Sequence, residues 1–137
     1  MAPEILAALH LRAFAGQGRA WKAPEFGQLL SSPKVWVFGD ERAFGLGRVV
    51  TDEAELLTLV CDPDHRRKGL ARDLLGQFES EAADRGADRL FLEVSSDNQA
   101  ALCLYASADF AEIGRRAGYY KTPSGRADAI IMEKRLT

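Results

Sequence analysis

Cysteine and histidine are both scarce in this chain, which has two of each among its 137 residues. Cys61 and Cys103 lie in apolar segments, and two cysteines do not make the disulfide framework of a small secreted domain. No group of Cys, His, Asp and Glu has zinc-ligand spacing, so we expect no metal. Free thiols favour a reducing compartment, which predicts a cytoplasmic protein. A nucleophilic Cys–His pair stays open as an alternative, although Cys103 fits helix packing.

A strong charge of either sign is also missing, because 18 basic and 20 acidic residues leave a net charge of -2. Nucleic-acid-binding domains are usually strongly basic, so we expect no nucleic-acid partner. No apolar run reaches the roughly 20 residues that span a membrane, and the N-terminal segment, which carries Glu4, lacks the basic start of a signal peptide. We therefore expect one soluble domain over residues 1–137, away from membranes, as a monomer or weak homodimer.

The two common glycine-rich phosphate motifs, G-x-x-x-x-G-K-[ST] and G-x-G-x-x-G, are absent, yet one segment has the form of an anion site. The apolar run Leu56–Cys61 predicts a strand buried on both faces, and Pro63 ends it. Apolar residues at helical spacing then predict a helix that ends near Arg85. The basic turn 66–68 and Gly69 lie where helix amides lack internal partners and the helix dipole is positive. Phosphate or pyrophosphate is the natural ligand there, and a solvated turn is the alternative.

The rest of the chain alternates short helices and strands. By residue number, we expect helices 3–14, 24–30 and 100–108 and strands 35–38, 42–50, 88–94, 110–116 and 127–136. The segment 119–125 is expected to be a loop. A strand, a helix and a strand in succession, as in 56–94, predict a right-handed parallel crossover.

Glu93 interrupts an apolar strand whose other residues suggest burial on both faces. A carboxylate is rarely buried unless it is paired or has a function. Desolvation would make it a stronger base, as general base catalysis near neutral pH requires. A position at the exposed end of the strand is the equally open alternative.

Asn98 and Tyr105 lie seven residues apart, so they share one face of the helix that follows Glu93. Asn98 could cap this helix or hydrogen-bond an amide of a ligand. Tyr105, taken alone, fits a core tyrosine with one hydrogen bond. Trp21 follows a glycine-rich loop, where an aromatic side chain is either a lid over the core or a wall of a substrate site.

Arg66-x-x-Gly69-x-Ala71 resembles the [QR]-x-x-G-x-[GA] loop of the GCN5-related N-acetyltransferases, the GNAT superfamily. The segments 92–110 and 115–132 are similar to the second half of a GNAT domain and, within it, to the RimI group of ribosomal-protein alanine N-acetyltransferases. The resemblance covers nearly the whole chain. It implies an α/β (α+β) fold, a single GNAT-like domain with a mixed central sheet of about six strands and helices on both faces.

The resemblance also implies roles for individual residues, with acetyl-coenzyme A (acetyl-CoA) as cosubstrate. Glu93 matches the general base of the family and Tyr105 its general acid. Tyr119 and Tyr120 match the segment that frames the acceptor peptide, and we expect Trp21 to line the same slot. Residues implied to bind the cosubstrate, through its pantetheine arm or its pyrophosphate, are Leu59, Val60, Cys61, Arg66, Arg67, Lys68, Gly69, Leu70, Ala71, Arg72 and Asn98.

Three departures from the family pattern have structural consequences. The chain starts at the first helix, so we expect the usual first strand to be missing or shortened. Ala71 stands where glycine is commoner in the family. The methyl group of alanine fits there if the backbone at this position is helical. Asp109 stands where glycine usually ends a helix, and aspartate tolerates the left-handed conformation better than most residues.

The resemblance makes N-terminal protein acetylation the leading hypothesis, with a small-subunit ribosomal protein that begins with alanine as the acceptor. A GNAT enzyme that acetylates lysine side chains or small-molecule amines is the alternative. A non-catalytic acetyl-CoA-binding module is a second alternative, which the presence of both Glu93 and Tyr105 disfavours.

Overall fold

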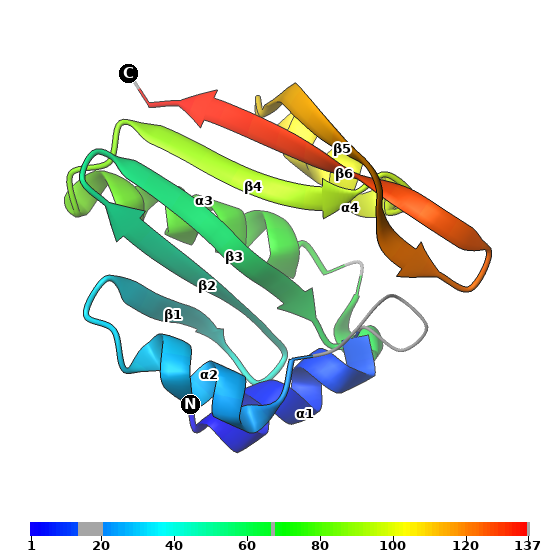
Figure 1. Cartoon of the computed structure of the whole chain (residues 1–137). Helices are drawn as coiled ribbons and strands as arrows, with labels where there is room; N and C mark the ends of the chain where they lie inside the picture. Colours follow the sequence, from blue (N-terminus) through cyan, green and yellow to red (C-terminus); the bar gives the residue numbers. More distant parts are fainter. Residues whose placement is uncertain (14–20, 67, 137) are drawn as a thin grey trace.

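The computed structural model describes residues 1–13, 21–66 and 68–136. Its helices are α1 (Pro3–Ala13), α2 (Ala23–Leu30), α3 (Leu70–Asp84) and α4 (Gln99–Ser107), with a short 3-10 helix, η1, at Pro63–His65. Its strands are β1 (Val35–Asp40), β2 (Ala43–Val50), β3 (Glu53–Cys61), β4 (Arg89–Ser95), β5 (Ala111–Thr122) and β6 (Gly125–Arg135). These strands form one mixed sheet in the order β1-β2-β3-β4-β6-β5 (Figure 1). The expected six-stranded sheet is confirmed, and no strand precedes α1 among the described residues.

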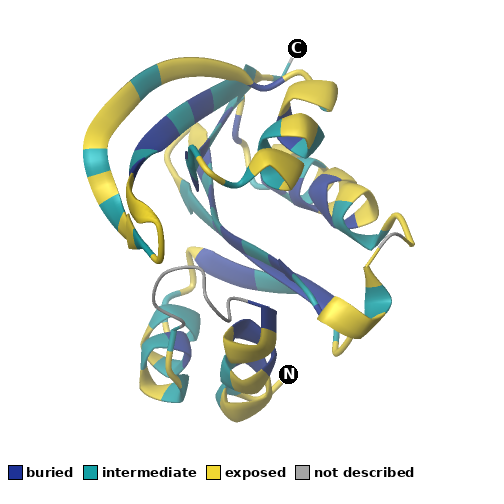
Figure 2. Cartoon of the chain, turned by 90° about the vertical axis from the view of Figure 1, so that its right-hand side faces the viewer, coloured by how far each residue is buried: buried dark blue, intermediate teal, exposed yellow. Residues whose placement is uncertain are grey.

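Helices cover both faces of the sheet, as expected (Figure 2). On one face, α1 and α2 bury Leu6 and Phe26 against apolar residues of β1, β2 and β3. On the other face, α3 and α4 bury Phe78 and Tyr105 against β3, β4 and β6. Full burial of one large apolar side chain stabilises a fold by about 1.5–3 kcal/mol, so these two layers fix the sheet between them.

The sheet opens between β3 and β4, which pair in parallel. β3 and β4 pair over 53–56 and 89–92 alone. At the end of this pairing β3 has a β-bulge, because Leu57 is an extra residue opposite the Leu46–Gly47 step of β2. Both Leu57 and Thr58 consequently point toward α1 and α2. Since a bulge bends its strand and increases the local twist, β3 diverges from β4 beyond this point (Figure 1).

The prediction that β3 and β4 are buried on both faces is wrong. Both strands bury alternate residues and leave the others partly exposed. The α3 side of each strand lies in the core. The opposite side of β4 is only partly covered, because α1 and α2 pack over β1, β2 and β3.

The predicted loop 119–125 is mostly strand, since β5 runs to Thr122 and β6 begins at Gly125. The pairing of these strands is irregular over 116–120, where β5 carries more residues than the facing stretch of β6. Gly118 has a φ of +58° within this bulge. Gly118 therefore marks a bulge within a long hairpin. The sequence pattern did not distinguish this hairpin from a loop.

The predicted ends of the two later helices are confirmed. Gly86 follows α3 with a φ of +93°, and Asp109 follows α4 with a φ of +73°. Ala71 lies in the first turn of α3, so its backbone is helical, as its methyl group requires.

Candidate active site

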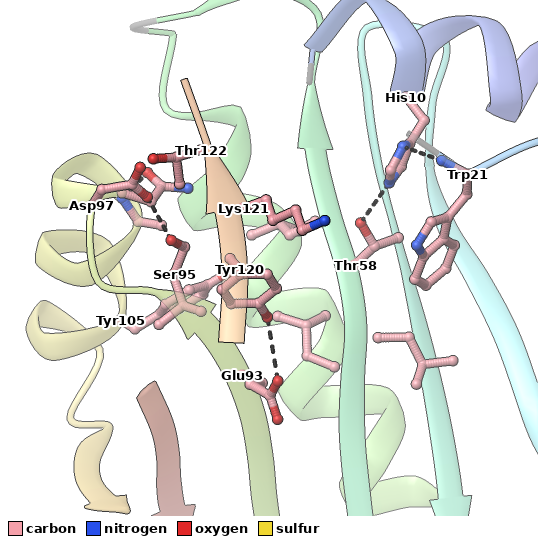
Figure 3. Close-up of a pocket in the computed structure, with 16 residues that line it drawn as sticks. His10, Trp21, Thr58, Glu93, Ser95, Asp97, Tyr105, Tyr120, Lys121 and Thr122 are labelled. Atoms are coloured by element: carbon pink, nitrogen blue, oxygen red, sulfur yellow. Dashed lines mark hydrogen bonds between the residues drawn. The ribbon is translucent and has the colours of Figure 1, made fainter. Parts of the chain in front are cut away.

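A cleft of about 260 Å³ lies at the opening between β3 and β4. Side chains reach it from α1, the segment before α2, β3, β4, α4 and its capping residue, and β5 (Figure 3). Those with polar chemistry include His10, Trp21, Thr58, Glu93, Asn98, Tyr105 and Tyr120. The cleft therefore collects residues from both faces of the sheet.

Glu93 lies within β4 and points to the face that carries α1 and α2, since its neighbours Leu92 and Val94 lie in the core under α3. Its side chain is 28% exposed, so it is neither fully buried nor at a free strand end. The Tyr120 hydroxyl donates a hydrogen bond to Glu93 Oε1 at 3.3 Å. Arg116 Nε lies 3.9 Å from Glu93 Oε2. These two partners orient the carboxylate at the cleft.

Tyr120 stays protonated beside Glu93. Burial, and then the negative charge of Glu93, raise the pKa of the Tyr120 phenol to about 12. The phenol is consequently a hydrogen-bond donor to the carboxylate throughout the neutral range. The structure thus places Tyr120, expected only to frame the acceptor, in direct contact with the candidate base.

Tyr105 approaches the cleft from the opposite face of the sheet. Its ring packs edge-on against Phe110, with ring centroids 6.0 Å apart, and the residue is only 8% exposed. Burial raises the pKa of its phenol well above the ordinary value. The Tyr105 hydroxyl makes no hydrogen bond to another described residue. Its phenolic proton is therefore available to a group in the cleft. Glu93 and Tyr105 therefore reach one cleft from the two sides of the sheet.

The predicted anion site lies at the start of α3. Gly69 is the residue before the first helical turn, and its φ is +75°, a conformation that glycine adopts without strain. A Cβ at this position would meet no atom within 4 Å, so the surface in front of it is open. The first hydrogen bond of the helix joins Asp73 N–H to Gly69 O at 3.1 Å. The amides of 70–72 therefore have no partner within the helix.

The basic side chains near this turn contact other parts of the protein. Arg66 donates to a backbone carbonyl at the end of α1 at 3.3 Å, and Lys68 Nζ lies 3.2 Å from Nδ1 of His65. Arg72 donates to a serine hydroxyl on α4 at 2.7 Å. Arg67 lies outside the described residues. The backbone amides are thus the donors that the turn offers most directly to an anion.

Leu59, Val60 and Cys61 continue β3 beyond its pairing with β4. Among the described residues, no strand pairs with this edge, so its backbone groups are available to an extended ligand. Burial raises the pKa of the Cys61 thiol, which argues against a nucleophilic role.

Asn98 caps α4 by accepting from Ala101 N–H at 3.2 Å, and it also lines the cleft.

Aromatic residues lie at the cleft and beside it. Trp21 lines it directly, although the glycine-rich loop expected before it lies in the undescribed stretch 14–20. Tyr119 is 52% exposed on β5, and its ring packs edge-on against Tyr120 at 5.1 Å between centroids. The Arg116 guanidinium lies 5.3 Å from the centre of the Tyr119 ring. Tyr119 thus contacts Tyr120 and Arg116, which are both partners of Glu93.

Several polar residues at the site were not predicted from the sequence, among them His10, Thr58 and Arg116. His10 stands four residues after Leu6 in an apolar helix stripe, and Thr58 is the only hydroxyl residue in the run 56–61. A polar residue where the pattern requires an apolar one was a usable signal in both cases. Arg116 gave no such signal, since its position beside Glu93 depends on the bulge in β5.

Two further observations concern the described residues as a set. They contain no group of three or more His, Cys, Asp or Glu side chains placed to hold a metal ion. None of their helices is long and apolar enough to cross a membrane.

The fold and the cleft together define a class of protein. A mixed sheet that opens beyond a bulge between two parallel strands, with helices on both faces and a glycine before the next helix, is a GNAT-like fold. The model of the acetyltransferase (GNAT) family matches residues 9–110, and the chain belongs to this family.

Individual relatives agree with this assignment. The Escherichia coli K12 protein named ribosomal protein bS18-alanine N-acetyltransferase is 47% identical over 94 residues, which cover 69% of this chain and 64% of that protein. The chain thus matches less than two-thirds of this relative's length. The crystal structure of the ribosomal-protein-S18-alanine N-acetyltransferase from Escherichia coli has a TM-score of 0.88 at 34% identity, covering 98% of this chain and 88% of that one. The fold is shared by an N-acetyltransferase from Staphylococcus aureus Mu50, which is 17% identical. Its structure has a TM-score of 0.81, covering 97% of this chain and 92% of that one.

Proposed function

We propose that this protein transfers the acetyl group of acetyl-CoA to the N-terminal α-amino group of a protein, and that the acceptor is a small-subunit ribosomal protein beginning with alanine. One observation carries the chemistry: a carboxylate, Glu93, and a protonated phenol, Tyr105, reach the same cleft from opposite faces of the sheet. The choice of acceptor rests on the similarity to the Escherichia coli protein, whose name specifies bS18 alanine.

In the proposed mechanism, each of the two side chains moves one proton. An α-amino group has a reference pKa of about 7.7–8.0, so much of it is charged at neutral pH and must lose a proton before it can attack. Glu93 Oε takes this proton, directly or through a water molecule. Tyr105 gives its phenolic proton to the sulfur that leaves. These transfers need no metal ion, and holding both reactants in one cleft supplies the entropic part of the acceleration.

The residues present fit acetyl-CoA, which supplies the acetyl thioester when bound. The unpaired edge of Leu59–Cys61 suits an extended amide-bearing arm, and the amides of 70–72 beside Gly69 suit a pyrophosphate. Asn98 lies at the cleft, where its side-chain amide can bind the same arm. Arg66, Lys68 and Arg72 would add positive charge around the phosphates, and we assign Arg67 the same role.

A peptide panel tests the proposal. Purified protein and acetyl-CoA are incubated with peptides that begin with Ala, Ser or Met, and with an N-blocked peptide that carries an internal lysine. We expect acetylation of the Ala-starting peptide at its α-amino group, located by mass spectrometry. Turnover of only the blocked peptide would establish the lysine alternative, and binding of acetyl-CoA without turnover would establish a non-catalytic module.

We propose a cytoplasmic enzyme that acts on a protein N-terminus without nucleic acid or membrane. We also propose a monomer or weak homodimer. Sedimentation velocity at several concentrations would contradict this last expectation if it showed a stable larger assembly.

Gly69→Asp should weaken acetyl-CoA binding at least about tenfold, or roughly 1.4 kcal/mol. The substitution places a negative charge beside the amides proposed to hold the pyrophosphate, and it adds strain at a φ of +75°. Isothermal calorimetry measures the effect. Gly69→Asn separates the two causes, because asparagine tolerates this conformation and carries no charge. Gly76→Asp, an exposed site in the middle of α3, should bind normally. Unchanged affinity in folded Gly69→Asp would contradict the assignment of the phosphate site.

Tyr119→Ala should raise the KM for the acceptor peptide about threefold to tenfold, while the KM for acetyl-CoA stays near its original value. Tyr119 is half exposed, and its ring contacts Tyr120 and Arg116, the two partners of Glu93, so it is placed to contact an acceptor. Ile113→Ala, an equally exposed residue of β5, is the matched control and should change neither constant. A shift of both constants, or of neither, would show that Tyr119 does not contact the acceptor.

A further inference from the structure

A fully buried histidine links α1, the segment before α2, and β3 at the cleft. His10 Nδ1 accepts the backbone N–H of Trp21 at 3.0 Å, and its Nε2 lies 3.3 Å from Thr58 Oγ1 (Figure 3). The imidazole also stacks on the Trp21 ring, with centroids 5.3 Å apart, and meets Phe26 edge-on at 5.6 Å. The ring is therefore held in one position by polar and apolar contacts.

These contacts determine which atom of each group carries a proton. Because Nδ1 of His10 accepts from Trp21 N–H, it has no proton, and the neutral ring carries its single proton on Nε2. Nε2–H then donates to Thr58 Oγ1. A threonine hydroxyl that accepts one hydrogen bond still has its own hydrogen to donate. Among the described residues, no other hydrogen bond of Thr58 Oγ1 occurs, so this hydrogen is available to the cleft that Thr58 lines.

Thr58 flanks the opening on the same face as the candidate base. It stands two residues beyond Leu56, the last residue of β3 that pairs with β4, while Glu93 stands one residue beyond Leu92 in β4. The bulge at Leu57 turns Thr58 toward α1, and Glu93 points to the same face of the sheet. An acceptor whose amino group lies at Glu93 can place its first peptide group in the part of the cleft that Thr58 lines, because both side chains line this cleft.

We infer that Thr58 is an acceptor-binding residue, whose hydroxyl donates a hydrogen bond to a backbone carbonyl oxygen near the start of the acceptor peptide, and that His10 is the residue that positions it. A peptide carbonyl is the matching ligand because it accepts without donating and is present in every peptide acceptor. A small amine with no carbonyl near its amino group lacks this contact. The inference rests on the proposed acetylation of a protein N-terminus.

Thr58→Val tests the hydroxyl, since valine keeps the shape of threonine and removes the donor. With the Ala-starting peptide, the acceptor KM should rise about threefold to tenfold, the range that one hydrogen bond provides, while kcat and the KM for acetyl-CoA change little. Thr58→Ser restores the hydroxyl and should restore the acceptor KM. An unchanged acceptor KM in Thr58→Val, or a Thr58→Ser variant as impaired as Thr58→Val, would overturn the inference.

Altering the peptide tests the same contact without a mutation. A thiocarbonyl accepts hydrogen bonds more weakly than a carbonyl, so wild-type protein should bind a peptide with a thioamide at its first peptide group less tightly. Thr58→Val should bind the two peptides nearly equally. Equal binding by the wild-type protein would overturn the inference even if Thr58→Val failed to fold.

A double-mutant cycle tests the role of His10. Asparagine at position 10 reaches the place of Nδ1 and can still accept from Trp21 N–H, but it is too short to reach Thr58. His10→Asn should raise the acceptor KM as Thr58→Val does, and the double variant should be no worse than either. If the double variant raised the acceptor KM by the product of the two single effects, His10 would act independently of Thr58. If the wild-type protein acetylates no peptide at all, the proposed function fails and this inference fails with it, whereas an active wild type with an unchanged Thr58→Val contradicts only the inference.

Discussion

Replacing Glu93 with glutamine should lower kcat/KM for the acceptor peptide by about 10²–10⁴-fold near neutral pH, the range for loss of a general base. Glutamine keeps the size of the side chain, and its carbonyl oxygen can still accept from Tyr120. The variant should therefore fold and bind acetyl-CoA normally. What it loses is a group that can take a proton from the acceptor amine.

The dependence on pH identifies the step that is lost. The α-amino group has a reference pKa of about 7.7–8.0, so raising the pH above 8 supplies free amine without a base. Activity of Glu93→Gln should recover partly between about pH 7 and pH 9.5. Tyr120 does not obscure this recovery, because burial, the largest cause of its raised pKa, persists in the variant and favours the protonated phenol.

A second carboxylate serves as a matched control. Glu55 lies on β3, is 44% exposed and pairs with Arg48, and it does not line the cleft. Glu55→Gln should leave kcat/KM near the wild-type value, because an exposed ion pair contributes little to stability. Near-normal activity of Glu93→Gln at neutral pH would exclude Glu93 as the base.

The sequence was most informative where each residue acts locally. The order of strands and helices, the glycine before α3 and the left-handed Asp109 all follow from short-range backbone preferences, and the structure agrees with them. The anion site at the start of α3 is of this kind, since helix amides and Gly69 are consecutive in the chain. Its binding role stays a prediction.

The sequence was least informative where the site depends on irregular pairing. A one-residue bulge at Leu57 turns Thr58 toward α1 and opens the sheet, and no composition signal marks it. The bulge near Gly118 brings Tyr120 to Glu93, and glycine in that segment suggested a loop instead. The partial exposure of Glu93 also depends on tertiary structure. α1 and α2 pack over β1, β2 and β3 and leave this side of β4 partly open, and the sequence does not show which strands a helix covers.

Tyr105→Phe should lower kcat by about 10²-fold and leave acetyl-CoA binding nearly unchanged. The substitution removes only a hydroxyl, and no hydrogen bond between described residues depends on it. The ring contact with Phe110 is retained, so the free energy of unfolding should change by less than about 1 kcal/mol. Calorimetry with acetyl-CoA and thermal unfolding check these two expectations, and steady-state kinetics measure the loss in kcat.

High pH should not rescue Tyr105→Phe, in contrast to Glu93→Gln. Burial raises the pKa of the Tyr105 phenol, so in the wild-type protein the proton that it donates is present at every pH at which the assay works. Supplying free amine does not replace a missing proton donor to the leaving sulfur. The pH profile of Tyr105→Phe should therefore run parallel to that of the wild type at a lower level. Identical profiles for Tyr105→Phe and Glu93→Gln would contradict the separate roles, because both residues would then act on the same step or only support the fold.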